Sequence, residues 1–277
     1  MGKRSNNPSE SSLLNDERPA TIPHMSTNKI EIGCQLYTLR DLAKTDMAGT
    51  LRAVADMGYR NVELIDFGNL PLPQLKDTLA GLNLTVTSQH FALPVLQTKL
   101  ADIIGYSGAF GYKFVICPWV PPEWRTAEKF RELGRILDGV GGKLREAGLQ
   151  LCYHHHDFEF QRFDGKYGLD LLFENADPRN LHLQLDTYWV KKGGEDPAAY
   201  LRKFAGRVPL VHLKDMAGDD KNSFAEVGAG ILDWKAIFSA AETAGVRYGL
   251  VEQDTCPRDP LDCVRVSFEN LKKMGRA

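Results

Sequence analysis

Four polar residues in the second half of the chain could together hold a divalent metal ion. Three are carboxylates and one is an imidazole: Glu159, Asp186, His212 and Glu252. A carboxylate-rich set suits hard cations such as Mn²⁺, Mg²⁺ or Co²⁺ better than it suits the thiolate-built site of a structural zinc ion. No cysteine pair in the chain has the close spacing of such a zinc site. We therefore predict a divalent metal centre, with Mn²⁺ favoured and Zn²⁺ as a further option.

A run of three histidines, 154–156, lies just before Glu159 and looks like a metal site in isolation. Neighbouring residues of a strand point to opposite faces, so only His154 and His156 can share one side. The run therefore cannot supply three ligands to one ion. We expect His154 and His156 to contact the substrate.

Further residues near the predicted strand ends are candidates for substrate binding. Lys214 lies two positions after the histidine of the predicted metal site and should share its face, and His90 ends an earlier apolar run. Trp119, Trp124 and Trp189 lie in predicted loops, where their rings could stack on a sugar. Packing in the core or in a lid is an equal alternative for each tryptophan. We expect His90, Lys214 and Trp189 to bind substrate.

A glycine-containing segment, 227–230, follows the seventh predicted strand. Many barrel enzymes bind phosphate near this position through backbone N–H groups. Two glycines without an adjacent basic residue are a weak indication of such a site. A tight loop before the next helix is the preferred interpretation, and a phosphate site is the alternative.

Short apolar segments that alternate with longer amphipathic ones must position these residues. The candidate strands lie at 30–36, 61–65, 85–90, 114–117, 149–153, 181–185, 208–213 and 249–252. The helical patterns lie near 47–57, 72–82, 96–110, 126–147, 169–175, 196–204, 233–244 and 260–274. Strands rich in Val, Ile and Leu without polar alternation suit a parallel sheet that is buried on both faces. Eight strand–helix units in about 245 residues match a closed (β/α)₈ barrel, whose active sites lie at the carboxyl ends of the strands. We predict an α/β fold with a single (β/α)₈ TIM barrel over residues 30–277, and two separate α/β domains are the alternative.

The composition argues against several classes of protein. With 34 Lys and Arg against 36 Asp and Glu, the net charge is −2, and the chain lacks the basic field of a nucleic-acid binder. No segment approaches the roughly 20 apolar residues of a membrane span. The five cysteines are widely spaced, which indicates reduced core residues and a cytoplasmic protein rather than a disulfide framework. Residues 1–29 are mostly polar, and we predict that they form a disordered leader.

The chain resembles the sugar phosphate isomerase/epimerase superfamily of xylose isomerase-like TIM barrels, which includes ketose 3-epimerases and inosose dehydratases. The resemblance covers nearly all of residues 30–274. It rests on GCQLYTLR at 33–40, YHHHDFEF at 153–160, LDTYWV at 185–190, VHLKD at 211–215 and VEQD at 251–254.

The resemblance implies a metal held by Glu, Asp, His and Glu from the last four strands, which correspond here to Glu159, Asp186, His212 and Glu252. Many members of the superfamily place the first glutamate within its strand, and that register would fall on His154. We favour Glu159 as the ligand from the fifth strand and keep His154 as the alternative.

The leading functional hypothesis is a metal-dependent isomerase or epimerase of a sugar, keto-sugar or polyol. The metal would hold a carbonyl and a neighbouring hydroxyl oxygen and would stabilise the enediolate formed when a proton leaves. Glu159 and Glu252 are the predicted acid/base pair on opposite faces of the substrate. The expected partner is a small carbohydrate, without nucleic acid or membrane, and formation of homo-oligomers is left open.

Three other functions remain in view. Loss of a β-hydroxyl from the same intermediate would make the protein a dehydratase, lyase or hydratase of a keto-inositol or a 3-keto-glycoside. A barrel that binds a sugar without turning it over is less favoured. A related metal-dependent abasic-site endonuclease would need further ligands and a basic groove, which the balanced charge and 7 histidines argue against.

Overall fold

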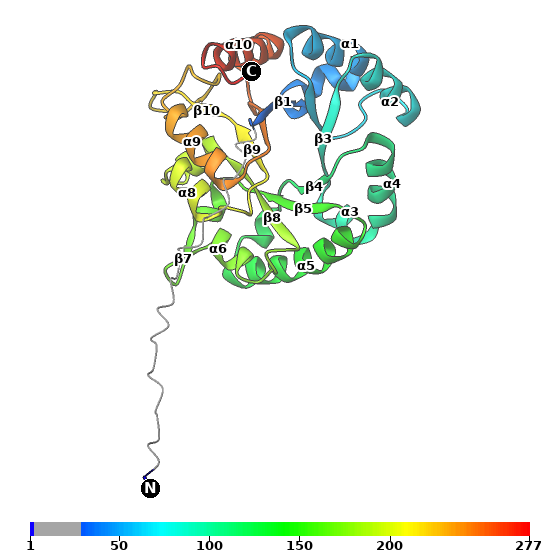
Figure 1. Cartoon of the computed structure of the whole chain (residues 1–277). Coiled ribbons are helices and arrows are strands. Elements are labelled where there is room, and N and C mark those ends of the chain that lie inside the picture. The colour runs from blue at the N-terminus through cyan, green and yellow to red at the C-terminus, as the bar shows by residue number, and fades with distance from the viewer. Residues whose placement is uncertain (3–28) are drawn as a thin grey trace.

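Eight parallel strands close into a barrel, and helices surround it (Figure 1). The computed structural model describes residues 1–2 and 29–277, so almost all of the predicted leader lies outside the described residues. Neighbouring strands follow the order β1-β12-β9-β8-β5-β4-β3-β2 around the barrel. They are β1 (Glu31–Gln35), β2 (Asn61–Leu64), β3 (Thr85–His90), β4 (Phe114–Cys117), β5 (Gln150–His154), β8 (Leu181–Asp186), β9 (Leu210–Leu213) and β12 (Tyr248–Val251). The predicted (β/α)₈ barrel is confirmed, and the alternative of two separate α/β domains is wrong.

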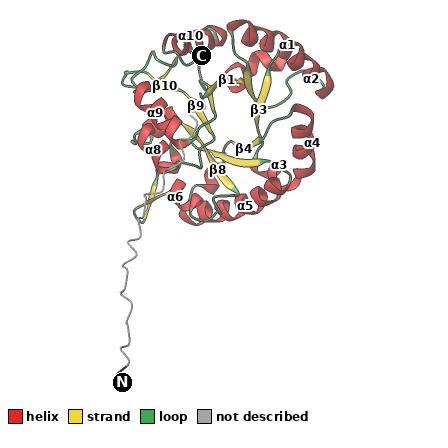
Figure 2. Ribbon diagram, in the orientation of Figure 1, coloured by secondary structure: helices red, strands yellow, loops and turns green. Residues whose placement is uncertain are grey.

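The helices form a ring outside the strands (Figure 2). They are α1 (Arg40–Met57), α2 (Leu72–Gly81), α3 (Leu93–Thr98), α4 (Leu100–Phe110), α5 (Ala127–Glu146), α6 (Gly168–Phe173), α7 (Thr187–Lys192), α8 (Pro197–Lys203), α9 (Trp234–Ala244) and α10 (Pro260–Lys273). The single helix predicted near 96–110 is two helices, because Lys99 leaves helical geometry with φ −127° and ψ 31°. Two small hairpins lie outside the barrel: β6 (Arg162–Phe163) with β7 (Lys166–Tyr167), and β10 (Asp215–Met216) with β11 (Phe224–Ala225).

Glycines end two of the helices that lead back to the barrel. Gly58 follows α1 with φ +111°, and Gly245 follows α9 with φ +84°. Glycine adopts this left-handed conformation without the steric cost that other residues pay. At both places the chain can turn sharply from helix to strand.

The inside of the barrel changes from apolar to polar along the strands. Residues two apart on a strand share a face, so each inward position is followed by another inward position nearer the carboxyl end. His154, His212 and Glu252 each follow an apolar inward residue in this way. The apolar residues form a cluster separate from the main core: Phe114, Ile116, Cys152, Leu210 and Leu250. The polar side chains of the carboxyl-terminal end therefore lie on a packed apolar layer.

The structure bears on two expectations from the composition, one about membrane-spanning helices and one about the cysteines. None of the helices in residues 1–2 and 29–277 is long and apolar enough to cross a membrane. Cys34, Cys117 and Cys152 are buried and carry free thiols. These three cysteines are core residues, as their place in apolar runs predicted.

Candidate active site

Four buried side chains meet at the carboxyl ends of neighbouring strands. His154 ends β5, Asp186 ends β8, His212 lies in β9 and Glu252 directly follows β12. Each offers one atom that could bind a metal, and these atoms all lie within 4.8 Å of one another. Because the four strands are successive neighbours in the barrel, their ends converge. This set, which we call the metal group, could hold one cation.

Asp186 also begins helix α7, and this determines how its carboxylate is shared. Its Oδ1 accepts a hydrogen bond of 3.0 Å from the backbone N–H of Trp189, which caps the helix. Its backbone N–H donates to Nε2 of His155 over 3.1 Å. His155 thus contacts the backbone of β8 and is not a member of the metal group, so the run of three histidines does not supply three ligands. Oδ2 of Asp186 is left to face the metal group.

Glu159 lies outside the metal group, contrary to our preference for it as the ligand from the fifth strand. It sits in a short 3₁₀ turn beyond the end of β5 and is fully buried. Its Oε1 accepts from the Tyr153 hydroxyl over 2.7 Å, and its Oε2 accepts from the backbone N–H of His156 over 2.8 Å. Burial raises the pKa of Glu159 to about 7. Because the chain leaves the barrel before Glu159, the member of the group from this strand is His154, the alternative that the register suggested.

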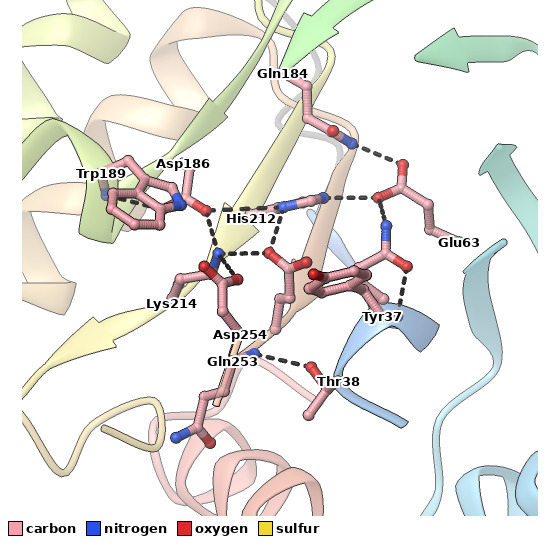
Figure 3. A network of polar contacts seen from close by, with 12 residues as sticks. Tyr37, Thr38, Glu63, Gln184, Asp186, Trp189, His212, Lys214, Gln253 and Asp254 are labelled. Atoms are coloured by element: carbon pink, nitrogen blue, oxygen red, sulfur yellow. Dashed lines mark hydrogen bonds and ion pairs between the residues drawn. The ribbon is translucent and has the colours of Figure 1, made fainter. Parts of the chain in front are cut away.

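Lys214 lies buried among three carboxylates (Figure 3). Its Nζ is 3.0 Å from Oδ2 of Asp186, 2.7 Å from Oε2 of Glu252 and 2.7 Å from Oδ1 of Asp254. Burial opposes the charge on Lys214, but the carboxylates outweigh it and hold the pKa well above its usual range. Lys214 neutralises the acidic side of the group and does not line the pocket described below, in contrast to the substrate contact expected from the sequence.

The charges of the metal group are strongly coupled. Burial would lower the pKa of His212, but Glu252 and Glu63 raise it to about 10. Burial raises the pKa of Asp186 to about 6, although Lys214 pulls it down. Burial would also raise the pKa of Glu252, but Lys214 and His212 hold it well below its usual range. Four carboxylates, from Asp186, Glu252, Asp254 and Glu63, thus share the positive charges of Lys214 and His212.

The residues of the metal group fit a divalent ion. Among the described residues, His154 Nδ1 is buried without a hydrogen-bond partner. Asp186 Oδ2, His212 Nδ1 and Glu252 Oε2 are paired only as ions, with Lys214 or with one another. Polar atoms are costly to bury unless a cation or an ion pair satisfies them. Two imidazoles with two carboxylates form a mixed nitrogen and oxygen set, which suits Zn²⁺, Co²⁺ or Mn²⁺ better than Mg²⁺.

A pocket of about 480 Å³ opens at the metal group, large enough for a small molecule. Its lining residues are Tyr37, Ile65, His90, Ala92, Pro118, Trp119, His154, His156, Glu252 and Asp254. The structure thus brings His90, His154 and His156 to the pocket wall, where the sequence placed substrate contacts. None of the described residues that line the pocket is a lysine or an arginine.

The tryptophans near the pocket have different surroundings. Trp119 lines the pocket and is 43% exposed, with the guanidinium of Arg125 5.4 Å from its ring centroid, so the face away from Arg125 can stack on a ligand. Trp189 is only 9% exposed and packs against Tyr188 and Phe224, with ring centroids 4.9 and 5.9 Å away. Its ring also lies 5.1 Å from that of His156. Trp189 therefore supports a pocket residue and does not itself line the pocket, which differs from the predicted substrate contact.

Two residues from the first half of the chain complete the site without having been assigned a role from the sequence. Tyr37 lines the pocket directly after β1. Glu63 of β2 is fully buried and contacts His212. A carboxylate inside a short apolar strand was the only indication available for Glu63. Its contact with His212 could not be predicted, because the two residues lie far apart in the sequence.

The glycine-containing segment after the seventh strand surrounds a carboxylate of the protein itself. Backbone N–H groups of Gly228, Gly230 and Leu232 donate to Asp215 over 2.9, 3.2 and 3.2 Å. The indole N–H of Trp234 donates to the same carboxylate over 2.6 Å. The N–H groups that a phosphate would need are therefore already paired. The segment is a tight loop, and the alternative of a phosphate site is not supported.

The chain matches a known protein family over most of its length. The family described as Xylose isomerase-like TIM barrel matches residues 51–253. An inosose dehydratase of Clostridium tetani is 31% identical over 156 residues, which are 50% of this chain and 52% of that protein. The chain thus spans about half the length of the curated relatives that it matches.

Two solved structures share the fold. A sugar phosphate isomerase/epimerase from Parabacteroides distasonis superposes with a TM-score of 0.78 at 24% identity, covering 88% of this chain and 98% of that chain. The IolI protein, crystallised with a bound zinc atom, superposes with a TM-score of 0.69 at 15% identity, covering 89% and 96%. At these identities the similarity concerns the fold alone.

Proposed function

Because the chain belongs to the xylose isomerase-like TIM barrel family, we propose that it is a metal-dependent enzyme that removes a proton beside the carbonyl group of a sugar, keto-sugar or polyol. The observation that carries the proposal is the metal group, His154, Asp186, His212 and Glu252, at the wall of a pocket of substrate size. A divalent ion held by these residues would supply Lewis-acid stabilisation of the negative charge that develops on the carbonyl oxygen.

Glu252 is the proposed proton acceptor. It lines the pocket, and its side chain is 4% exposed. Lys214 and His212 keep its pKa well below the usual range despite burial, so the carboxylate is ionised at neutral pH. An ionised carboxylate at the pocket wall can accept a proton from an adjacent carbon. This assignment to Glu252 is the one made from the sequence.

His156 takes the place of Glu159 as the proposed second proton-transfer group. Glu159 is buried against the Tyr153 hydroxyl and does not line the pocket, whereas His156 does. Burial lowers the pKa of His156 well below its usual range, so the imidazole is neutral at pH 7. A neutral imidazole can accept or donate a hydrogen bond at a substrate hydroxyl. His90, also in the wall, is proposed to bind a further hydroxyl.

Once a proton has left the carbon beside the carbonyl group, two outcomes are possible: the proton returns to the substrate, or a hydroxyl group leaves it. Return of the proton to the other face or to the neighbouring carbon gives epimerisation or isomerisation, which is the leading proposal. Dehydration is the second candidate, and the similarity to the inosose dehydratase of Clostridium tetani favours it. In that case Glu252 would pass the proton taken from the carbon to the departing hydroxyl, which leaves as water, and His156 would hydrogen-bond to that hydroxyl.

The charges around the pocket favour an uncharged substrate. Glu252 and Asp254 line it, and none of the described lining residues is basic. The loop at 228–230, which could have bound a phosphate, already binds Asp215. A phosphorylated sugar would therefore find no lysine or arginine in the described pocket lining to pair with its phosphate. We propose a neutral keto-sugar or keto-polyol as substrate.

A deuterium-exchange screen tests the proposal. Protein loaded with Mn²⁺ is mixed in D₂O with ketoses, keto-inositols and 3-keto-glycosides, and NMR follows deuterium at the carbon beside the carbonyl. We expect exchange with at least one neutral substrate, with product formation that distinguishes isomerisation from dehydration. Metal-free protein and Asp186→Ala are the controls and should not catalyse exchange. Binding of a sugar without any exchange in the metal-loaded protein would indicate a sugar-binding barrel instead.

A further inference from the structure

Glu63 is a carboxylate enclosed by hydrogen-bond donors in the middle of the barrel. Gln35 donates to its Oε1 over 2.6 Å, while Ser88 and Gln184 contact its Oε2 over 2.5 and 2.7 Å. The amide of Gln35 is oriented by its own Oε1, which accepts from the backbone N–H of Tyr37 over 3.0 Å. Glu63 thus has well-defined partners on both oxygens and a fixed position.

His212, itself a member of the metal group, lies between Glu63 and another member, Asp186 (Figure 3). Its Nε2 is 2.7 Å from Oε1 of Glu63, while its Nδ1 is 2.9 Å from Oε2 of Glu252 and 3.8 Å from Oδ2 of Asp186. An ionised carboxylate can only accept a hydrogen bond, so Nε2 of His212 carries a hydrogen beside Glu63. In the absence of metal Nδ1 also donates, to Glu252, and a metal bound at Nδ1 would replace that hydrogen. The opposite nitrogen, Nδ1, is the one that faces the metal group.

We propose that Glu63 is a positioning residue that holds His212 in the tautomer with its hydrogen on Nε2 and directs the Nδ1 lone pair to the metal. The inference rests on the proposed function, because it requires that His212 bind a metal. A carboxylate behind a metal-binding histidine fixes the ring and increases the basicity of the ligand nitrogen. Glu63 therefore contributes to metal affinity although it lies on the far side of the imidazole.

The same carboxylate connects the metal group with the pocket wall. Nε2 of His90 is 3.0 Å from Oε1 of Glu63 and 3.1 Å from Nε2 of Gln35. The ring of His90 lies parallel to that of His212, with 5.9 Å between the centroids and 14° between the planes. One buried group from β2 thus orients a pocket residue from β3 and a metal-group residue from β9.

A second metal ion bound by Glu63 itself is the competing interpretation. Glu63, His90 and His212 have potential ligand atoms within 4.8 Å of one another. However, the N–H groups of Gln35 and Gln184 point at the carboxylate, and a cation there would meet them at close range. The donors around Glu63 favour hydrogen bonds from the protein over a metal bond.

Zn²⁺ binding to the full chain tests the inference. Dissociation constants for Zn²⁺ are measured by competition with a chelator on the unmodified protein, on Glu63→Gln and on the control variant Ser107→Ala. Glu63→Gln keeps the shape but not the charge of the side chain, and we expect it to weaken Zn²⁺ binding by about 10- to 100-fold. Ser107→Ala removes a buried hydroxyl that donates to the backbone oxygen of Tyr112 and contacts neither Glu63 nor His212, so it should leave the affinity close to that of the unmodified protein.

¹⁵N NMR of the Zn²⁺-loaded unmodified protein tests the tautomer without any substitution. We expect His212 to show a protonated Nε2 and a metal-bound Nδ1. The reverse assignment, or unchanged affinity in a folded Glu63→Gln protein, would overturn the role of Glu63 and leave the proposed function intact. Two Zn²⁺ ions per chain, with one lost in Glu63→Gln, would make Glu63 a ligand and also overturn the inference. Failure of the unmodified protein to bind any divalent ion would instead refute the proposed function.

Discussion

Replacing Lys214 with methionine tests how the acidic side of the metal group is neutralised. In the metal-free protein, the Lys214 ammonium group lies within 3.0 Å of carboxylates from Asp186, Glu252 and Asp254. Methionine retains much of the side-chain volume but removes the charge. The change leaves two buried carboxylates and a third, 24% exposed, without their lysine partner.

The expected loss of stability is large. Removing one partner of a buried ion pair costs about 3–5 kcal/mol, because the remaining charge is left without compensation. For a domain of this size each kcal/mol lowers the melting temperature by roughly 2–4 °C, so we expect metal-free Lys214→Met to melt roughly 6–20 °C below the unmodified protein. A divalent ion brings positive charge to the same carboxylates. Metal should therefore stabilise the variant more than the unmodified protein.

The loss of stability caused by Lys214→Met should also depend on pH. Burial raises the pKa of Asp186 to about 6 even with Lys214 present, and removal of Lys214 should raise it further. An acid with a raised pKa in the folded protein costs stability when it is ionised, and protonation relieves that cost. The difference in melting temperature between Lys214→Met and the unmodified protein should therefore narrow as the pH falls from 8 to 5.

Calorimetric melting of chelator-treated protein provides the measurement. Lys192→Met is the matched control, because Lys192 is 36% exposed and its Nζ lies 3.8 Å from Oδ2 of Asp157. An exposed pair of this kind contributes about 0–1 kcal/mol. A metal-free Lys214→Met protein that melts no lower than the control would refute the reasoning. So would a stability difference that metal and low pH leave unchanged.

Three further substitution experiments probe the metal group and the proton transfer. Asp186→Ala and His212→Ala should each lose the bound metal and all turnover, measured by elemental analysis and the exchange assay; normal metal content in both would disprove the proposed site. His154→Gln should weaken metal binding more than Glu159→Gln, which should mainly raise KM; the reverse order in a chelator titration would return the ligand to Glu159. Glu252→Gln keeps the shape and one oxygen ligand, so it should retain most of its metal but lose at least about 10²-fold in kcat. Undiminished solvent exchange in that variant would show that another group carries the proton.

The barrel strands could be located from the sequence because each is buried on both faces. Their apolar runs stand out from the amphipathic helices, and the predicted ends lie within two residues of those observed, from β1 (Glu31–Gln35) to β12 (Tyr248–Val251). Helix α7 (Thr187–Lys192) was read as a loop that contains Trp189. That helix is only six residues long, and its start depends on the side chain of Asp186. Local periodicity is weak evidence over so short a segment.

Residue types and alternation within strands were enough to place Asp186, His212 and Glu252 at one end of the barrel, since each ends or follows an apolar run. They could not decide between His154 and Glu159, because both lie near the end of β5. The choice depends on where the chain leaves the barrel and on Tyr153, whose hydroxyl holds Glu159 away from the group.

The contact between Glu63 and His212 joins residues 149 positions apart. A pattern within one strand shows which side chains point inward, but it does not show which of them meet across the barrel. Closure of eight strands, with β1 beside β12, brings inward side chains from both halves of the chain to the same axis. The residue types that form the site can therefore be identified from the sequence, whereas the contacts between them depend on closure of the barrel.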